Sequence, residues 1–104
     1  MPKYLFAYTR GSLPETEEEQ ASVMAAWGAW LEEMGSAVVD PGNPFGPSKT
    51  VATDGSVSEG ETTGLGGYSV IETDDLDSAV EMAKGSPNLT AGGTVEVYET
   101  IEVM

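Results

Sequence analysis

The stretch GYSVIETDDLDSAVEMA, residues 67–83, contains the two patterns that decide the fold. Its first part, residues 67–73, is rich in β-branched and aromatic side chains and predicts a strand. Asp74 predicts a helix N-cap, because Asp77 follows three residues later at the spacing of a capping box. An apolar stripe at helical spacing predicts one buried face, made of Leu76, Ala79, Val80 and Ala83. Gly85 and the proline that follows it predict the end of this helix.

A similar strand and helix precede this unit at the N-terminus. Residues 4–9, YLFAYT, predict a central strand whose two faces are both covered. Either Ser12 with Glu15 or Thr16 with Glu19 gives the capping-box spacing for a helix start. Gly35 predicts the C-cap of that helix. Its apolar face is predicted to consist of Val23, Trp27, Trp30, Leu31 and Met34.

The other segments connect these two units. Residues 37–39 predict a short strand, and the prolines and glycines of residues 40–47 exclude helix and sheet there. Residues 50–53 predict an edge strand that ends in the Asp54-Gly55 turn. The polar, glycine-rich residues 56–67 predict a loop. Residues 94–103 predict the last strand, whose alternation puts these side chains on one face: Val95, Val97, Ile101 and Val103.

The order β-α-β-β(-β)-α-β predicts an α+β, ferredoxin-like βαββαβ domain, with an antiparallel sheet and two helices on one face. A chain of 104 residues has the size of one domain, and we expect a single domain over residues 1–104. No second helical layer remains to cover the other face of the sheet. We therefore expect a second copy to cover it in a sheet-to-sheet homodimer.

Composition excludes several classes of function. With 18 acidic and 4 basic residues the formal net charge is −14, which argues against nucleic acids and membranes as partners. Without His and Cys there is no Ser-His-Asp triad, thiol nucleophile, disulfide or Cys/His metal site. The acidic run at residues 73–77 lacks the spacing of an EF-hand, so we expect no metal and no cofactor. The N-terminal apolar run is too short for a signal peptide, and we expect a cytoplasmic protein.

Several short motifs, in this order, resemble the YCII-related or DGPF-domain family. They are VATDG at 51–55, GGYSVIE at 66–72, DLD at 75–77 with Ala79, Pro87, and VEV at 95–97. The resemblance implies a small α+β protein of the dimeric α/β-barrel type. Enzyme-like members are thought to use a His on the first helix with an Asp in a pocket beneath it. On an ungapped comparison Trp27 stands in place of that His, so a His-Asp pair cannot operate here.

Two functional hypotheses follow from the residues and the resemblance. In the first, a homodimer without established catalysis binds a small organic molecule in a pocket between sheet and helix. The ligand-binding candidates are Trp27, Asn43, Asp54 and Tyr68. In the second, a small lyase, isomerase or hydrolase-like enzyme uses Asp54 as its acid/base, which requires burial to raise the carboxyl pKa. Each candidate also has a structural interpretation: Trp27 and Tyr68 as core residues, and Asp54 as a turn residue.

Overall fold

The computed structural model describes residues 1–61 and 63–103. Within these ranges the chain follows the predicted order, with one more strand and one more short helix than the sequence patterns indicate. The elements are β1 (Lys3–Thr9), α1 (Glu17–Met34), the 3₁₀ turn η1 (Gly35–Ala37), β2 (Val38–Asp40), β3 (Lys49–Val51), β4 (Val57–Glu59), β5 (Leu65–Glu72), α2 (Leu76–Ala83), α3 (Pro87–Thr90) and β6 (Val95–Glu99).

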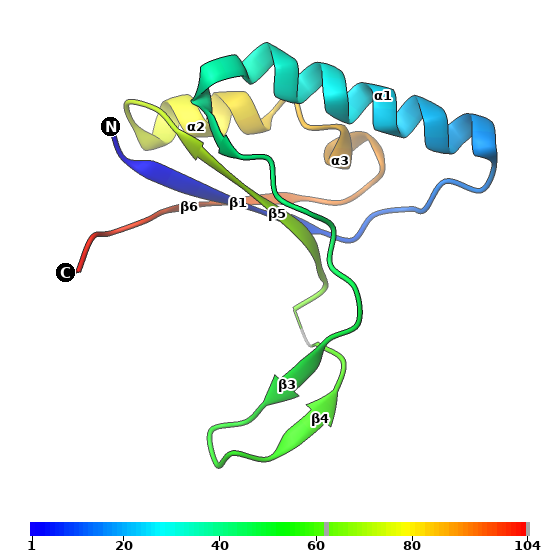
Figure 1. The fold of residues 1–104 in the computed structure, drawn as a ribbon, viewed down its shortest axis with the longest axis vertical. Coiled ribbons are helices and arrows are strands. Elements are labelled where there is room, and N and C mark those ends of the chain that lie inside the picture. Colours follow the sequence, from blue (N-terminus) through cyan, green and yellow to red (C-terminus); the bar gives the residue numbers. More distant parts are fainter. Residues whose placement is uncertain (62, 104) are drawn as a thin grey trace.

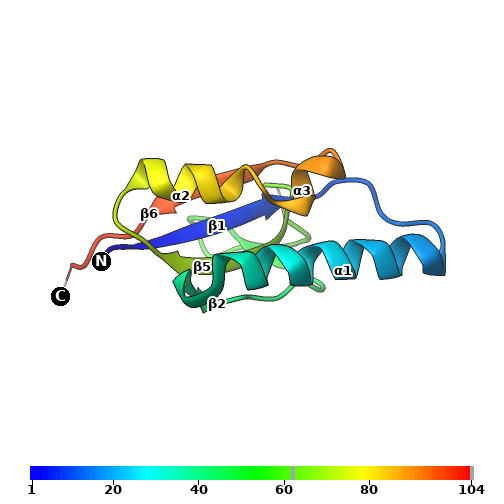
Figure 2. The same cartoon turned by 90° about the horizontal axis from the view of Figure 1, so that it is seen from above.

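The main sheet has the strand order β2-β5-β1-β6, and all of its pairs are antiparallel. All three helices lie on one face of this sheet, as Figures 1 and 2 show from two directions. This arrangement confirms the predicted ferredoxin-like α+β fold. We call the face without helices the open face; by strand register its centre carries Leu5, Ala7, Tyr68, Val70 and Tyr98, and the charged side chains of Lys3, Glu72 and Glu96 also lie on it.

Strands β3 and β4 form a separate two-stranded hairpin. Figure 1 shows that it extends away from the body on the side of the sheet opposite the helices. We call residues 49–59 the arm. The prediction of a loop over residues 56–67 was wrong, because Val57 pairs with Val51 across the Asp54-Gly55 turn and β5 already begins at Leu65. The polar side chains of this segment hid a short strand from the hydrophobic pattern.

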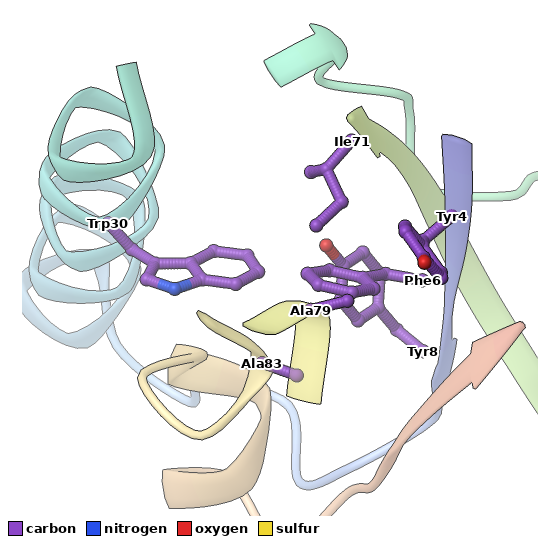
Figure 3. Close-up of a cluster of buried hydrophobic side chains, with 7 residues drawn as sticks. All are labelled: Tyr4, Phe6, Tyr8, Trp30, Ile71, Ala79 and Ala83. Carbon is purple, nitrogen blue, oxygen red and sulfur yellow. The ribbon is translucent and has the colours of Figure 1, made fainter. Parts of the chain in front are cut away.

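The core lies between the sheet and the helices (Figure 3). Trp30 reaches from α1 to stack on Phe6 of β1, with ring centroids 6.0 Å apart. Its indole Nε1 donates a hydrogen bond to the Met82 carbonyl at 3.0 Å, so the polar atom of this buried side chain has a partner. The cluster of buried side chains consists of Tyr4, Phe6, Tyr8, Trp30, Ile71, Ala79 and Ala83.

The helix starts follow the predicted chemistry, with one change of residue. Thr16 is the N-cap of α1, and its hydroxyl accepts from the Glu19 amide at 3.0 Å; this confirms the second of the two predicted starts and excludes Ser12. Asp75 caps α2 by accepting from the Ser78 amide at 2.8 Å, so the prediction of Asp74 was wrong by one residue. No helix in the described ranges is long and apolar enough to cross a membrane.

The predicted apolar faces are only partly buried. On α2 the small residues Ala79 and Ala83 are buried, whereas Leu76 and Val80 stay partly exposed. Strand β6 ends at Glu99, four residues before the predicted end at position 103. The apolar side chains beyond it, Ile101 and Val103, are consequently exposed, as is Val23 near the start of α1.

Candidate functional site

A cavity of about 330 Å³ lies beside the segment that leads from β2 into the arm. This volume is at the lower end of the range for small-molecule sites, roughly 300–1,000 Å³. We call it the loop cleft. Its walls come from the end of β1, the proline-rich loop, and the segment that leads from the arm into β5. They are formed by Arg10, Phe45, Gly46, Pro47, Ser48, Glu61, Thr63 and Leu65.

Two glycines of β5 allow the proline-rich loop to approach the sheet closely. Gly66 is skipped in the pairing of β1 with β5 and so forms a bulge, because Tyr8 pairs with Gly67 and Thr9 with Leu65. The Phe45 amide donates to the Gly66 carbonyl at 2.8 Å. A Cβ on Gly67 would lie only 3.1 Å from the Asn43 carbonyl oxygen. The glycine pair before Tyr68 therefore provides both a bulge and a close backbone approach.

The loop that carries Phe45, the aromatic wall of the cleft, is held in place by contacts of Tyr68 and Asp40. The Phe45 ring stacks on Tyr68 with centroids 5.9 Å apart and an interplanar angle of 19°. The Tyr68 hydroxyl lies 3.4 Å from Oδ2 of Asp40, and Oδ1 of Asp40 accepts from the Gly42 amide at 2.8 Å. Asp40 thus closes the turn that starts the loop and is close to the Tyr68 hydroxyl. These contacts fix the loop that carries Phe45.

The polar side of the cleft is an ion pair between Arg10 and Glu61. Arg10 Nε lies 3.8 Å from Glu61 Oε1, while Glu61 Oε2 accepts from the Gly64 amide at 2.5 Å. The Arg10 stem lies over Gly66, where a Cβ would be 3.1 Å from its Cγ. An ion pair this exposed contributes at most about 1 kcal/mol. A ligand oxygen can therefore replace the carboxylate beside Arg10 at little cost.

The four ligand-binding residues predicted from sequence do not come together in one chain. Trp27 packs edge-on against Tyr8, with centroids 4.9 Å apart, on the helix face of the sheet. Tyr68 pairs with Ala7, the neighbour of Tyr8, so it projects to the opposite, open face. Asn43 is exposed and belongs to the loop that carries Phe45. Neither Tyr68, Asn43 nor Trp27 lines the loop cleft; Tyr68 stacks under its Phe45 wall, and Asn43 lies two residues before Phe45.

Asp54 lies at the tip of the arm. Its Oδ1 accepts from the Ser56 amide at 2.9 Å, and Gly55 has a positive φ of 90°. Hydrogen bonds from Ser56 lower the pKa of the Asp54 carboxyl. An acid/base near neutral pH needs the opposite shift. The structure thus gives Asp54 the role of a turn residue.

A buried chain of hydroxyl groups under α1 was not predicted from the sequence. The Tyr8 hydroxyl donates to Ser69 Oγ at 2.8 Å, and Ser69 Oγ donates to the Pro41 carbonyl at 2.7 Å. The alternation of β1 and β5 puts both side chains on the helix face, but only the strand register shows that they are neighbours. The chain ties the start of the proline-rich loop to the core.

The hydrogen bond and burial of Tyr8 make the protein less stable at alkaline pH. Burial raises the pKa of Tyr8 to about 12, and the Ser69 hydrogen bond lowers it by less. In the unfolded chain Tyr8 ionises near pH ~10, so its stabilisation is complete below that pH and is lost as the pH rises to about 12. We expect the free energy of unfolding to fall by about 1–2 kcal/mol over this range.

Urea unfolding at pH 9, 10, 11 and 12 measures this decline, and Tyr8→Phe is expected to reduce it. Burial also raises the pKa of Tyr4, so part of the decline will remain in that variant. Tyr98→Phe is the control, because Tyr98 is 50% exposed. Equal pH profiles for the two variants would contradict the assignment to Tyr8.

A second cavity of about 350 Å³ lies between α2, α3 and β6. Its lining is apolar apart from Lys84, and ligand sites usually combine apolar walls with several converging polar groups. Among the described residues, no three acidic side chains converge as the ligands of a metal ion would. The loop cleft is therefore the better candidate for the functional site.

Comparison with known proteins identifies the family. The model of the YCII-related domain matches residues 4–104, almost the whole chain. The chain belongs to the YCII-related family. A search of curated proteins found no match. Among solved structures, the YCII-related chain is similar to 5-chloro-2-hydroxyhydroquinone dehydrochlorinase (TftG) from Burkholderia phenoliruptrix AC1100, solved as a complex with 2,5-dihydroxybenzoquinone.

That similarity covers 96% of this chain and 94% of the dehydrochlorinase, with a TM-score of 0.58 and 19% sequence identity. At this level of identity the likeness supports the fold of this YCII-related chain. It leaves the chemistry of the loop cleft to be argued from the chain's own residues.

Proposed function

We propose that this YCII-related protein is a homodimer that binds a small, planar organic molecule in the loop cleft. The observation that carries the proposal is the pairing of an aromatic wall with a polar anchor across one cavity. Phe45, stacked on Tyr68, offers a flat apolar surface, and Arg10 offers hydrogen-bond donors beside it. Aromatic walls combined with a few placed polar groups are typical of ligand sites.

The size and donors of the cleft favour a single-ring compound with oxygen substituents. A cavity of about 330 Å³ accommodates one ring better than a fused system. Arg10 is the only arginine of the chain, and a guanidinium recognises oxygen acceptors through several N–H groups. The dehydrochlorinase TftG, which shares the fold, was solved with 2,5-dihydroxybenzoquinone, a compound of this kind. We use that compound as the first test ligand.

The sequence places the pocket between sheet and helix, close to Trp27. In the structure that interface is occupied by aromatic packing, since Trp27 and Trp30 lie 5.5 Å apart and both contact Tyr8. The proposal therefore moves the ligand to the loop cleft, where Asn43 and Tyr68 remain neighbours of the site. Trp27 and Asp54 do not contribute to it within one chain.

The homodimer is supported by the open face of the sheet. The side chains at its centre are apolar, and Tyr98 among them is 50% exposed. A sheet buries its apolar face against another layer, and in a chain with its helices on one side that layer must come from elsewhere. A second copy supplies it with two-fold symmetry.

The alternative of a lyase, isomerase or hydrolase-like enzyme that uses Asp54 finds less support. Asp54 is exposed at the tip of the arm, away from the loop cleft, and the pKa of its carboxyl is lowered. If turnover of a ring compound is found, Asp54→Asn is expected to leave it unchanged.

Binding of 2,5-dihydroxybenzoquinone to variants tests the proposed site. We expect Phe45→Ala and Arg10→Gln each to weaken binding at least about tenfold, since each removes a wall or a charged donor. Lys84→Gln is the matched control, because it removes a cation from a surface ion pair elsewhere and changes the net charge equally. Isothermal titration calorimetry gives the dissociation constants.

Two results would contradict the proposal. One is that Arg10→Gln and Lys84→Gln weaken ligand binding equally. In that case Arg10 would act only through the net charge of the protein and not through contact with the ligand. The other is the absence of binding by the wild-type protein to 2,5-dihydroxybenzoquinone, hydroquinone and benzoate at millimolar concentration.

A further inference from the structure

The arm is an independent projection. Its residues 51–59 are all exposed, and its hydrogen bonds are formed within the hairpin and its base, such as Ala52 N to Ser56 O at 2.7 Å and Gly60 N to Ser48 O at 2.9 Å. The Cα radius of gyration is 15.1 Å, whereas about 13 Å is expected for a compact chain of this length. The arm, which projects from the body in Figure 1, contributes to this difference.

An isolated two-stranded hairpin is at best marginally stable in water. Here the arm also exposes a directly opposed apolar pair, Val51 and Val57, whose relative exposures are 68% and 61%. The opposite face of the arm carries the polar pair Thr50 and Ser58. The face with the valines also carries the Lys49–Glu59 ion pair, whose Nζ and Oε1 atoms are 3.4 Å apart, so its apolar part is the Val51–Val57 pair. Within the described residues both valines of this pair stay more than half exposed.

The arm and the open face lie on the same side of the molecule. The arm leaves the body on the side without helices, so it forms a wall next to the exposed sheet (Figure 1). Four strands about 4.8 Å apart and about five residues long have a flat footprint of only ~300 Å². A stable interface buries about 800 Å² per partner. The open face alone is therefore small for a dimer, and the arm supplies further surface on the correct side.

We infer that the arm is a clasp that packs the Val51–Val57 face onto a second copy of this chain, while the two open faces cover each other. Two-fold symmetry lets each copy provide one arm and receive one. An anionic membrane or a polyanion is a poor occupant, because the net charge of −14 repels it. A second copy carries the same charge, so apolar burial by both the sheet and the arm has to outweigh the repulsion.

The clasp also links assembly to the ligand site, and this part of the inference rests on the proposed function. Pro47 and Ser48 at the base of the arm, with Glu61 just beyond it, are walls of the loop cleft. A partner that fixes the arm also fixes these walls. By thermodynamic reciprocity, a ligand that fills the cleft then strengthens the dimer.

The test compares Val57→Glu with Ser58→Glu, two neighbours that face opposite sides of the arm. Both add one negative charge to each copy, so long-range repulsion changes equally. Sedimentation velocity over a range of concentrations gives the dimer dissociation constant without ligand. We expect Val57→Glu to raise it at least about thirtyfold and Ser58→Glu by less than about threefold. The double variant Val51→Thr/Val57→Thr, which keeps β-branched side chains, is expected to have an intermediate effect.

A dimeric wild-type protein with equal responses to Val57→Glu and Ser58→Glu would overturn the clasp but leave the homodimer intact. A monomeric wild-type protein would overturn both. Far-ultraviolet circular dichroism of each variant checks that the body stays folded. The wild-type protein could also fail to bind the ligand while Val57→Glu and Ser58→Glu change the dimer dissociation constant as expected. This result would overturn only the proposed function of the cleft and its coupling to the clasp.

Discussion

Trp30→Ala is expected to lower the free energy of unfolding by about 3–5 kcal/mol. Trp30 is 5% exposed and is the buried side chain of α1. It stacks on Phe6 and donates to the Met82 carbonyl, so its removal leaves a cavity and takes away one of the hydrogen bonds that this carbonyl accepts. The expected loss is a large part of the roughly 5–15 kcal/mol by which a domain is stable.

Equilibrium unfolding in urea, followed by circular dichroism, measures this loss. Met24→Ala is the control on the same helix, because Met24 is 74% exposed and is expected to change stability by less than about 0.5 kcal/mol. A Trp30→Ala variant as stable as Met24→Ala would show that α1 is not anchored to the sheet by this residue.

Gly42→Ala is expected to cost about 3 kcal/mol or more. Gly42 has a φ of +75°, and a Cβ at this position would lie 1.6 Å from the Tyr68 carbonyl oxygen. The Tyr68 oxygen belongs to the backbone and the Cβ is fixed to the backbone of residue 42, so no side-chain rotation relieves the clash. The loop must therefore move away from β5. Movement of the loop also displaces Phe45 from Tyr68, and we therefore expect ligand binding to be lost along with stability.

Gly60→Ala separates the two causes of that cost. Gly60 also has a positive φ, of 82°, but a Cβ there meets nothing within 4 Å. It is expected to cost only about 1 kcal/mol, the penalty of the left-handed backbone alone. Thermal unfolding of both variants gives the comparison, and equal losses would contradict the close packing of Gly42 against β5.

The order of the main elements was predictable because their patterns are local. The alternation of residues 4–9, the helical spacing of Trp27, Trp30 and Leu31, and the Asp-rich cap of α2 each fit one element. A helix boundary was predicted wrongly where two neighbouring residues are both able to cap the helix. Asp74 and Asp75 are both capable N-caps, and only the backbone shows that Asp75 accepts from Ser78.

Strand β4 and the loop cleft depend on contacts that the sequence pattern does not encode. Val57 looks isolated among polar residues until it pairs with Val51. Arg10 and Glu61 are far apart in the chain, and their ion pair forms beside the bulge at Gly66. Phe45 lies in the proline-rich loop, and only the fold shows that its ring stacks on Tyr68. Asn43 and Tyr68 were predicted as ligand-binding residues from the sequence, whereas Arg10 and Glu61, which form the charged side of the loop cleft, were not.

The central claim is that the ligand site is the loop cleft rather than the interface between sheet and helix. Titration of ¹⁵N-labelled protein with 2,5-dihydroxybenzoquinone tests it most directly, because amide shifts report position. We predict the largest shift changes at residues 43–48 and 64–68, with the amides around Trp27 unaffected. Largest changes at residues 23–31 of α1, or no saturable change at any amide, would contradict the account.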